Sequence, residues 1–217
     1  MTDKQQFLET VRVALRDGIP PNLLRPLPDT PNDPIEYTPD LSDTLGAFIR
    51  SAGDSGAELV GTPDEALDVV VRRVLDTVAP KVVAVSNDPE CDGVAETLTS
   101  AGIEISAPND IAATAAADLG ITGAVAGIAL TGSVVVDAKR AKGRLASLLP
   151  KVHLVLLSTR RIVSTPGDVF RKMDDWFPDG LPSNVVLITG PSRSADIELE
   201  ITEGVHGPQQ LLIALVD

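Results

Sequence analysis

Short apolar segments alternate with segments of helical periodicity between residues 58 and 117, and this alternation limits the possible folds most strongly. The apolar segments are typical of strands and lie at residues 58–61, 81–86 and 103–106. Helices are expected after them at residues 62–78, 88–101 and 109–117, with Thr62 and Asn109 as capping residues. Because the strands are almost entirely apolar, this order predicts an α/β fold with a mainly parallel sheet and helices on both faces.

The uncharged run at residues 119–136 is long enough to raise the question of a membrane span. Four glycines and three hydroxyl residues interrupt it, and Asp118 and Asp137 bracket it, so a spanning helix is disfavoured. Buried strands are expected here instead, at 119–122, 125–129 and 133–136. These strands are too close in sequence for crossover helices between them, so hairpin pairing must make the sheet mixed.

The rest of the chain divides into an N-terminal part and a domain. Residues 1–40 contain a predicted amphipathic helix at 3–16, followed by an arm with seven prolines, which fix φ and remove backbone donors. This arm is either a linker or an extension that packs across the domain or onto another subunit. The predicted α/β domain spans residues 41–217. Its later elements are expected as strands at 153–158, 185–189 and 211–216, and as a helix at 167–176.

The composition argues against several classes of function. Over 217 residues the formal net charge is -13 and aromatic residues make up 3%, so no nucleic-acid partner is expected. Cys91 is the single cysteine, whereas iron–sulfur and structural zinc sites need several thiolates. We therefore expect no metal site and no cofactor bound by this chain. The first residues lack the pattern of a secretory signal, so a cytoplasmic location is expected.

Positive charge is concentrated in residues 139–172, which contain nine Lys or Arg residues and one acid, Asp168. Within this segment, residues 139–144 follow a predicted strand and include Gly143, which lets backbone amides approach a ligand. A carboxylate or phosphate site that includes Arg144 is one interpretation. A solvent-exposed loop is the other, because runs of charge commonly have no further role.

A second candidate is the segment 189–198, which follows a predicted apolar strand. A strand that ends in a Gly/Ser turn and opens into a short helix would place backbone N–H groups and Arg193 around one point. This arrangement suits an anion, and a purely structural turn is the alternative. The segment also approaches the Gly-x-Ser-x-Gly pattern of serine hydrolases, but Ser194 replaces the last glycine. The two histidines, His153 and His206, lie in an apolar strand and a tight turn, so a catalytic triad is disfavoured.

Several strings of residues are specific enough to compare with known families. They are ADLGITGA at 117–124, GIALTGS at 127–133, Gly143-Arg144 followed by SLLP at 147–150 and His153, ITGPSRSADIE at 188–198, and GVHGP at 204–208. Together they resemble the LUD domain of the lactate-utilization protein C family. The resemblance covers about residues 40–217, and the string at 188–198 is the longest.

This resemblance implies a fold like that of glucosamine-phosphate isomerase, ribose-phosphate isomerase and the CoA-transferases. It also implies a role in oxidising L-lactate to pyruvate as a non-redox subunit, beside partner proteins that carry the iron–sulfur chemistry. We expect such a subunit to bind a small carboxylate or phosphate-bearing ligand. The residues expected to line its pocket come from the glycine-rich turns and the basic segment; they are Thr131, Gly132, Ser133, Arg144, Gly190, Ser192, Arg193, Ser194 and His206.

Two other functions stay open at this point: a stand-alone enzyme of the isomerase or CoA-transferase type, and a structural or regulatory interaction protein. The family commonly has an acid where this chain has Leu130. If that acid acts on substrate elsewhere in the family, this chain has either lost the corresponding activity or never needed it.

Overall fold

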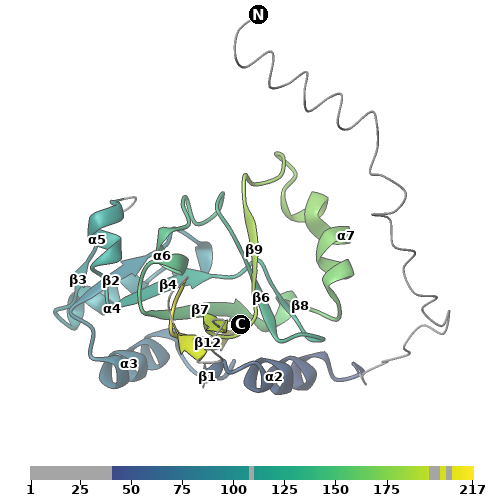
Figure 1. Cartoon of the computed structure of the whole chain (residues 1–217), viewed down its shortest axis with the longest axis horizontal. Coiled ribbons are helices and arrows are strands. Elements are labelled where there is room, and N and C mark those ends of the chain that lie inside the picture. The colour runs from purple at the N-terminus through teal and green to yellow at the C-terminus, as the bar shows by residue number, and fades with distance from the viewer. Residues whose placement is uncertain (1–40, 108–109, 196–200, 204–206) are drawn as a thin grey trace, which may run out of the picture. The chain divides into compact units, whose positions relative to one another are not determined.

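Six parallel strands form the main sheet of the protein (Figure 1). The computed structural model describes residues 41–107, 110–195, 201–203 and 207–217. The strands are β1 (Glu58–Gly61), β2 (Val82–Val85), β3 (Glu104–Ile105), β4 (Leu119–Gly123), β7 (Val152–Ser158) and β12 (Gln210–Val216). They lie in the order β1-β12-β7-β4-β2-β3, and every neighbouring pair is parallel. The predicted α/β class with a mainly parallel sheet is confirmed.

Contacts divide the chain into two units, residues 1–39 and residues 40–217. The described residues all belong to the second unit. The predicted N-terminal helix and proline-rich arm lie outside the described residues. In the part of the chain that the structure describes, no helix is long and apolar enough to cross a membrane.

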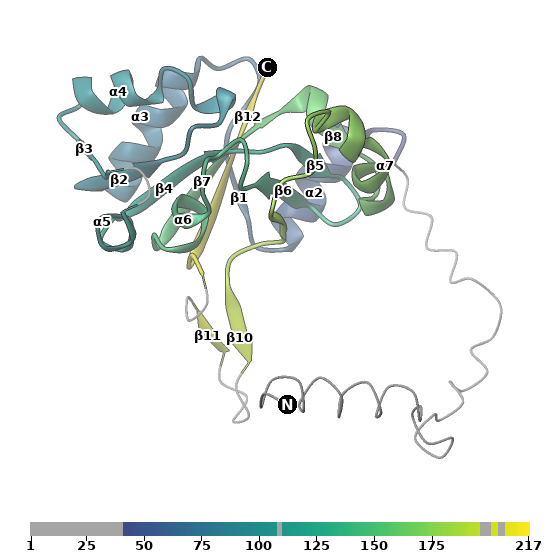
Figure 2. The ribbon, with the colours of Figure 1, turned by 90° about the horizontal axis from the view of Figure 1, so that it is seen from above.

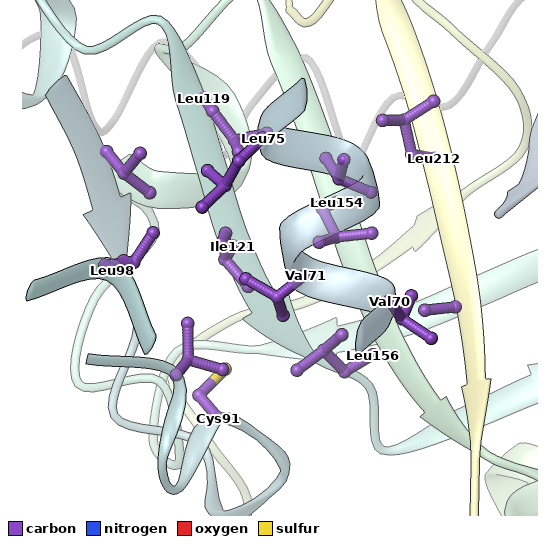
Figure 3. Close-up of a cluster of buried hydrophobic side chains, with 14 of the residues drawn as sticks. Val70, Val71, Leu75, Cys91, Leu98, Leu119, Ile121, Leu154, Leu156 and Leu212 are labelled. Carbon is purple, nitrogen blue, oxygen red and sulfur yellow. The ribbon is translucent and has the colours of Figure 1, made fainter. Parts of the chain in front are cut away.

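Helices cover both faces of the six-stranded sheet. They are α3 (Leu67–Val78), α4 (Val94–Ser100), α5 (Ile111–Ala115) and α6 (Leu145–Leu148). The first two pack on one face and the last two lie on the other (Figure 2). Val71 and Leu75 of α3 meet Ile121 and Leu154 of the sheet in one buried cluster (Figure 3). Burial of each such side chain contributes roughly 1.5–3 kcal/mol, so this cluster holds α3 firmly on the sheet.

A second sheet of four strands packs beside the first. Its strands, in spatial order, are β8 (Ile162–Val163), β5 (Ala126–Ile128), β6 (Ser133–Asp137) and β9 (Val185–Ile188). β6 pairs antiparallel with both β5 and β9, whereas β5 and β8 are parallel. The hairpin pairing expected within residues 119–136 is therefore present. However, β4 belongs to the first sheet, and the chain changes sheet between β4 and β5.

Two further helices enclose the second sheet; they are α2 (Thr44–Asp54) and α7 (Pro166–Trp176). Phe48 of α2 is buried with Val134 of β6 and Val155 of β7, in a cluster between α2 and the two sheets. Val169 of α7 packs with Val135 in a separate cluster on the other face of the second sheet. β6 thus buries successive side chains on opposite faces, as a central strand does.

Two predicted helices begin later or break, each for a local reason. α3 begins at Leu67, because Thr62 and Glu65 form a separate turn in which the Thr62 N–H donates to Glu65 Oε2 at 3.0 Å. The next predicted helix is divided into a 3-10 turn at Pro89–Cys91 and α4. Gly93, with φ +83°, lies between the two pieces, and this left-handed conformation cannot continue a helix.

Two other predictions also differ from the structure. The segment after β9 does not open into a short helix but forms β10 (Arg193–Ala195), which pairs antiparallel with β11 (Ile201–Glu203). Its backbone groups therefore find their hydrogen-bond partners across a hairpin rather than within a helical turn. α5 is capped by Asp110, whose Oδ1 accepts from the Ala113 N–H at 2.9 Å. The predicted cap, Asn109, lies outside the described residues.

Candidate functional site

The strand order creates a topological switch point between β2 and β4. From β2 the chain goes to α4 on one face and then to β3 at the edge of the sheet. From β4 it goes to the second sheet and then to α6, on the opposite face (Figure 2). In open parallel sheets, ligands bind outside the carboxyl ends of the strands at such a point. A binding site is therefore expected beyond the ends of β2 and β4.

A cleft lies at this place, and we call it the switch-point cleft. It lies between the carboxyl ends of β2, β3 and β4 and the loop from β6 to α6, and it is open to solvent on one side. Its polar lining is rich in hydroxyl and amide side chains, which are Ser86, Asn87, Ser106, Thr114, Thr122, Ser147 and Asn184. Asp137, Lys142 and Arg144 supply the charged groups, so the cleft offers both donors and acceptors.

Asp137 ends β6 at the wall of the cleft and is 4% exposed. Its Oδ1 accepts hydrogen bonds from the N–H groups of Lys139 and Arg140, both at 2.8 Å, which fixes the turn after β6. Its Oδ2 is buried and has no hydrogen-bond partner among the described residues, and the same holds for Asn184 Oδ1. Because an unpaired buried acceptor is costly, a bound molecule that donates a hydrogen bond here would be favoured.

The loop between β6 and α6 brings two cations to the same cleft. Lys142 and Arg144 are exposed, and neither forms an ion pair with a described residue. Lys142 has φ +51°, a left-handed conformation that costs roughly 1–2 kcal/mol for a residue with a Cβ. Unpaired cations beside a cleft with low-dielectric walls attract anions, and strained backbone is common at functional sites.

A buried polar network supports the cleft from the end of β2. Arg140 pairs with Glu90, and their side chains are only 18% and 13% exposed. Asp88 is buried and accepts hydrogen bonds from the Ser86 hydroxyl and from the Gly123 N–H, the latter at 3.0 Å. Burial raises the pKa of the Asp88 carboxyl. The network therefore ties the loop after β2 to the end of β4 and to the turn after β6.

The sequence-predicted site residues are divided among separate places, and Arg144 lies in the switch-point cleft. Thr131, Gly132 and Ser133 lie together near the C-terminal end of α2. The Ser133 hydroxyl is 2.7 Å from Thr131 Oγ1 and 2.6 Å from Thr189 Oγ1, so these three hydroxyl groups form a chain of hydrogen bonds. These hydrogen bonds link the turn after β5 to the end of β9.

A second cavity contains Gly190 and Ser192 from the predicted set. It shares Ser147 with the switch-point cleft, and its lining includes the fully buried His153. His153 Nε2 lies 2.9 Å from Oγ1 of Thr122, which lines the cleft, and its Nδ1 has no partner among the described residues. Burial lowers the pKa of His153 to about 3, so the ring is neutral. The two cavities are therefore neighbours across these three residues.

Three other predicted positions come from the part of the chain after β9. Arg193 and Ser194 lie on β10, and His206 lies outside the described residues. Leu130, at the position where the resembled family commonly has an acid, packs against the apolar cluster between the second sheet and α7. Within the described ranges, no three His, Cys, Asp or Glu side chains are grouped to hold a metal ion.

Asp137 and Asn184 were missed as site residues by sequence reasoning. Asp137 appeared there only as the charged residue that closes an uncharged run. An acid placed directly after a buried strand was the available signal, since the ends of buried strands are where binding residues gather. Asn184 carries no such signal, because its proximity to Asp137 depends on the pairing of β9 with β6, whose register joins Val185 to Asp137.

Comparison with known proteins gives a family match over the C-terminal half of the chain. Residues 100–216 match the LUD domain family. The lactate utilization protein C of Halalkalibacterium halodurans is 31% identical over 164 residues, which are 72% of this chain and 71% of that protein. The protein of the same name from Exiguobacterium sp. is 27% identical over 226 residues, which cover 100% of this chain and 96% of that protein.

Other similarities are shorter or concern the fold alone. An uncharacterized protein of Neisseria meningitidis is 36% identical over 99 residues, so the matched segment spans 42% of that protein and 46% of this chain. The crystal structure of a DUF162 family protein from Deinococcus radiodurans superposes with a TM-score of 0.61 and covers 81% of this chain and 98% of that chain. At 22% sequence identity, this last similarity concerns the fold.

Proposed function

Because this chain belongs to the LUD domain family, we propose that it is a ligand-binding, non-redox subunit of an L-lactate utilization system. In this proposal, partner proteins with iron–sulfur clusters oxidise lactate to pyruvate in the cytoplasm, and this chain binds a small carboxylate or phosphate-bearing ligand. Support for the pathway comes from relatives that carry the name lactate utilization protein C.

The cysteine content supports the division of labour between this chain and its partners. Cys91 is the single cysteine of the sequence, and its thiol is buried beside Asp88 and Glu90. Burial raises the pKa of the Cys91 thiol to about 12, so the thiolate that a metal cluster or a nucleophilic step requires is disfavoured. We therefore assign the iron–sulfur chemistry to partner proteins in this proposal.

The observation that carries the ligand-binding proposal is a pair of cations, Lys142 and Arg144, at a polar cleft on the switch point; neither forms an ion pair with a described residue. Of the residues predicted from the sequence, Arg144 is the one we assign to the anionic group of the ligand. Ser192 and Gly190 line the neighbouring cavity, which shares Ser147 with the cleft.

Loss of either cation should weaken anion binding by at least about 10-fold, because a hydrogen bond to a charged group contributes roughly 1.5–3 kcal/mol. We expect this result for Arg144→Ala and Lys142→Ala in titration calorimetry with L-lactate and with inorganic phosphate. The matched control is Lys172→Ala, which removes an exposed cation from α7, away from the cleft lining. Equal affinities for all four proteins would remove the switch-point cleft from the proposal.

The place of the chain in lactate utilization has a separate test in the organism. Cells without this protein should fail to grow on L-lactate as carbon source and recover when the gene is supplied on a plasmid. The tagged protein, expressed at its native level in lactate-grown cells, should co-purify with iron–sulfur proteins. Normal growth of the deletion strain, together with purification free of any iron–sulfur protein, would refute the proposed subunit role.

A further inference from the structure

We propose that the switch-point cleft selects anions that also carry a hydroxyl group, with the anionic group at Lys142 and Arg144 and the hydroxyl at Asp137. This inference rests on the proposed anion site and names the class of molecule that the site takes. It is carried by buried polar atoms that have no hydrogen-bond partner among the described residues. They lie where the end of β6 meets the start of β9, on the wall of the cleft.

Two of these atoms are acceptors and require a donor. Asp137 Oδ2 and Asn184 Oδ1 are both buried, and neither has a hydrogen-bond partner among the described residues. The two residues are neighbours, since the Ala138 N–H donates to the Asn184 carbonyl at 3.1 Å. The carboxylate cannot turn away freely, because its other oxygen accepts from two backbone N–H groups of the turn. A ligand group at this position must donate, and a keto or carboxylate oxygen would be repelled.

The surrounding charge favours a neutral donor over a cationic one. Within seven residues after Asp137 the chain carries Lys139, Arg140, Lys142 and Arg144. Arg140 pairs with Glu90, so the charged groups that line the cleft are Lys142 and Arg144 against Asp137. This set is positive on balance and disfavours an ammonium group on the ligand, whereas a hydroxyl group carries no charge. Arg140 Nη1 is in addition a buried donor without a partner among the described residues. A hydroxyl can donate and accept at once, so it suits a turn that holds unpaired atoms of both kinds.

The same chemistry is present in hydroxy acids and in hydroxylated phosphate esters. Both classes carry an anionic group and a hydroxyl group in one small molecule, which are the two groups that this cleft is proposed to bind. Titration calorimetry with matched pairs distinguishes them. The pairs are L-lactate against propionate and against pyruvate, and sn-glycerol 3-phosphate against propyl phosphate.

We expect the hydroxylated member to bind at least about 10-fold more tightly than its partner, because the lost hydrogen bond leaves a charged group unpaired. A preference within the first series identifies a hydroxy acid as the ligand class, and one within the second identifies a phosphate ester. This comparison uses the unmodified full chain, so it does not depend on the folding of a variant.

Asp137→Asn gives a second, independent readout. The amide can keep its oxygen toward the Lys139 and Arg140 N–H groups, and then its nitrogen replaces the unpaired acceptor with a donor. The preference for L-lactate over pyruvate should therefore disappear or reverse, because the pyruvate keto oxygen can accept from the new amide. Asp175→Asn, the same change at an exposed position of α7, should leave the preference unchanged.

The outcomes separate this inference from the proposed function. If anions bind in an Arg144-dependent way but hydroxylated and non-hydroxylated partners bind equally, the hydroxyl selectivity is refuted and the anion site stands. If Asp137→Asn keeps the full preference for L-lactate, the assignment of the hydroxyl to Asp137 is wrong. If no anion binds at all, both the anion site and its selectivity fall.

Discussion

Gly132→Ala should lower the free energy of unfolding by about 3–5 kcal/mol, which is a large part of the stability of an ordinary domain. Gly132 has φ +65°, a conformation that is strained for alanine whatever space surrounds it. An added Cβ would also overlap the backbone nitrogen of Ala52 and the backbone carbonyl carbon of Ser51. Because these atoms belong to helix α2 rather than to a flexible side chain, relief requires the helix to move off the second sheet.

Urea unfolding of two glycine variants separates the two causes. Gly180 has φ +98° with no atom within 4 Å of an added Cβ, so Gly180→Ala should cost only the backbone strain, roughly 1 kcal/mol. Gly53 lies inside α2 with open space around it, so Gly53→Ala should stabilise the protein by roughly 0.5–1 kcal/mol. A cost for Gly132→Ala no greater than that for Gly180→Ala would show that α2 does not pack against this turn.

The surroundings of Gly132 and Gly190 show why these two residues are glycines. Gly132 and Gly190 were both expected from the sequence to line a ligand pocket. In the structure an added Cβ at Gly190, which has φ +71°, would overlap the carbonyl oxygen of Ser55, just beyond α2. Both glycines thus have a packing reason to be glycine that requires no ligand. A glycine-rich turn after a strand has the same appearance in a sequence whether a helix or a ligand approaches it.

The parallel sheet could be predicted from the sequence because its signals are local. Each strand of the sheet is a short apolar run, and the segments between β1 and β4 have the length and periodicity of crossover helices. The segments from β4 to β7 and from β7 to β12 contain strands of the second sheet instead. The division into two sheets could not be predicted in this way. β6 pairs with β9, about 50 residues later in the chain, and β5 pairs with β8, about 35 residues later, so partner choice depends on the packing of distant segments.

The candidate site could also be predicted only where its residues carry a local signal in the sequence. Arg144 was found because a run of positive charge is visible in any sequence. Asp137 was not recognised, since a carboxylate at the end of a strand is usually solvated, and only the fold shows that this one is buried. The relation of Asn184 to Asp137 and of His153 to Thr122 is set by strand register, which no local pattern of the sequence contains.

The buried His153 should make the protein lose stability in mild acid. Its pKa is about 3 in the folded state because burial disfavours the charged ring, whereas an unperturbed histidine has a pKa of about 6.5. Above pH 6.5 the ring is neutral in both states and the full stability is present. As the pH falls below 6.5 only the unfolded state takes up the proton, so the free energy of unfolding decreases by roughly 1.4 kcal/mol per pH unit. This decrease continues until the pH approaches the folded pKa.

Between pH 6.5 and pH 5 the expected loss from this single residue is about 2 kcal/mol. Glu65 and Asp168 do not obscure it, because their pKa values are about 2 in the folded state and they stay ionised in both states over this range. His153→Gln keeps a hydrogen-bonding group near Thr122 but cannot titrate, so its stability should change by about 2 kcal/mol less over the same interval. Chemical denaturation of both proteins at pH 7, 6 and 5 measures this difference directly. Parallel curves would mean that His153 takes up a proton in the folded protein, which requires that water or a counter-charge reach its ring from one of the two adjoining cavities.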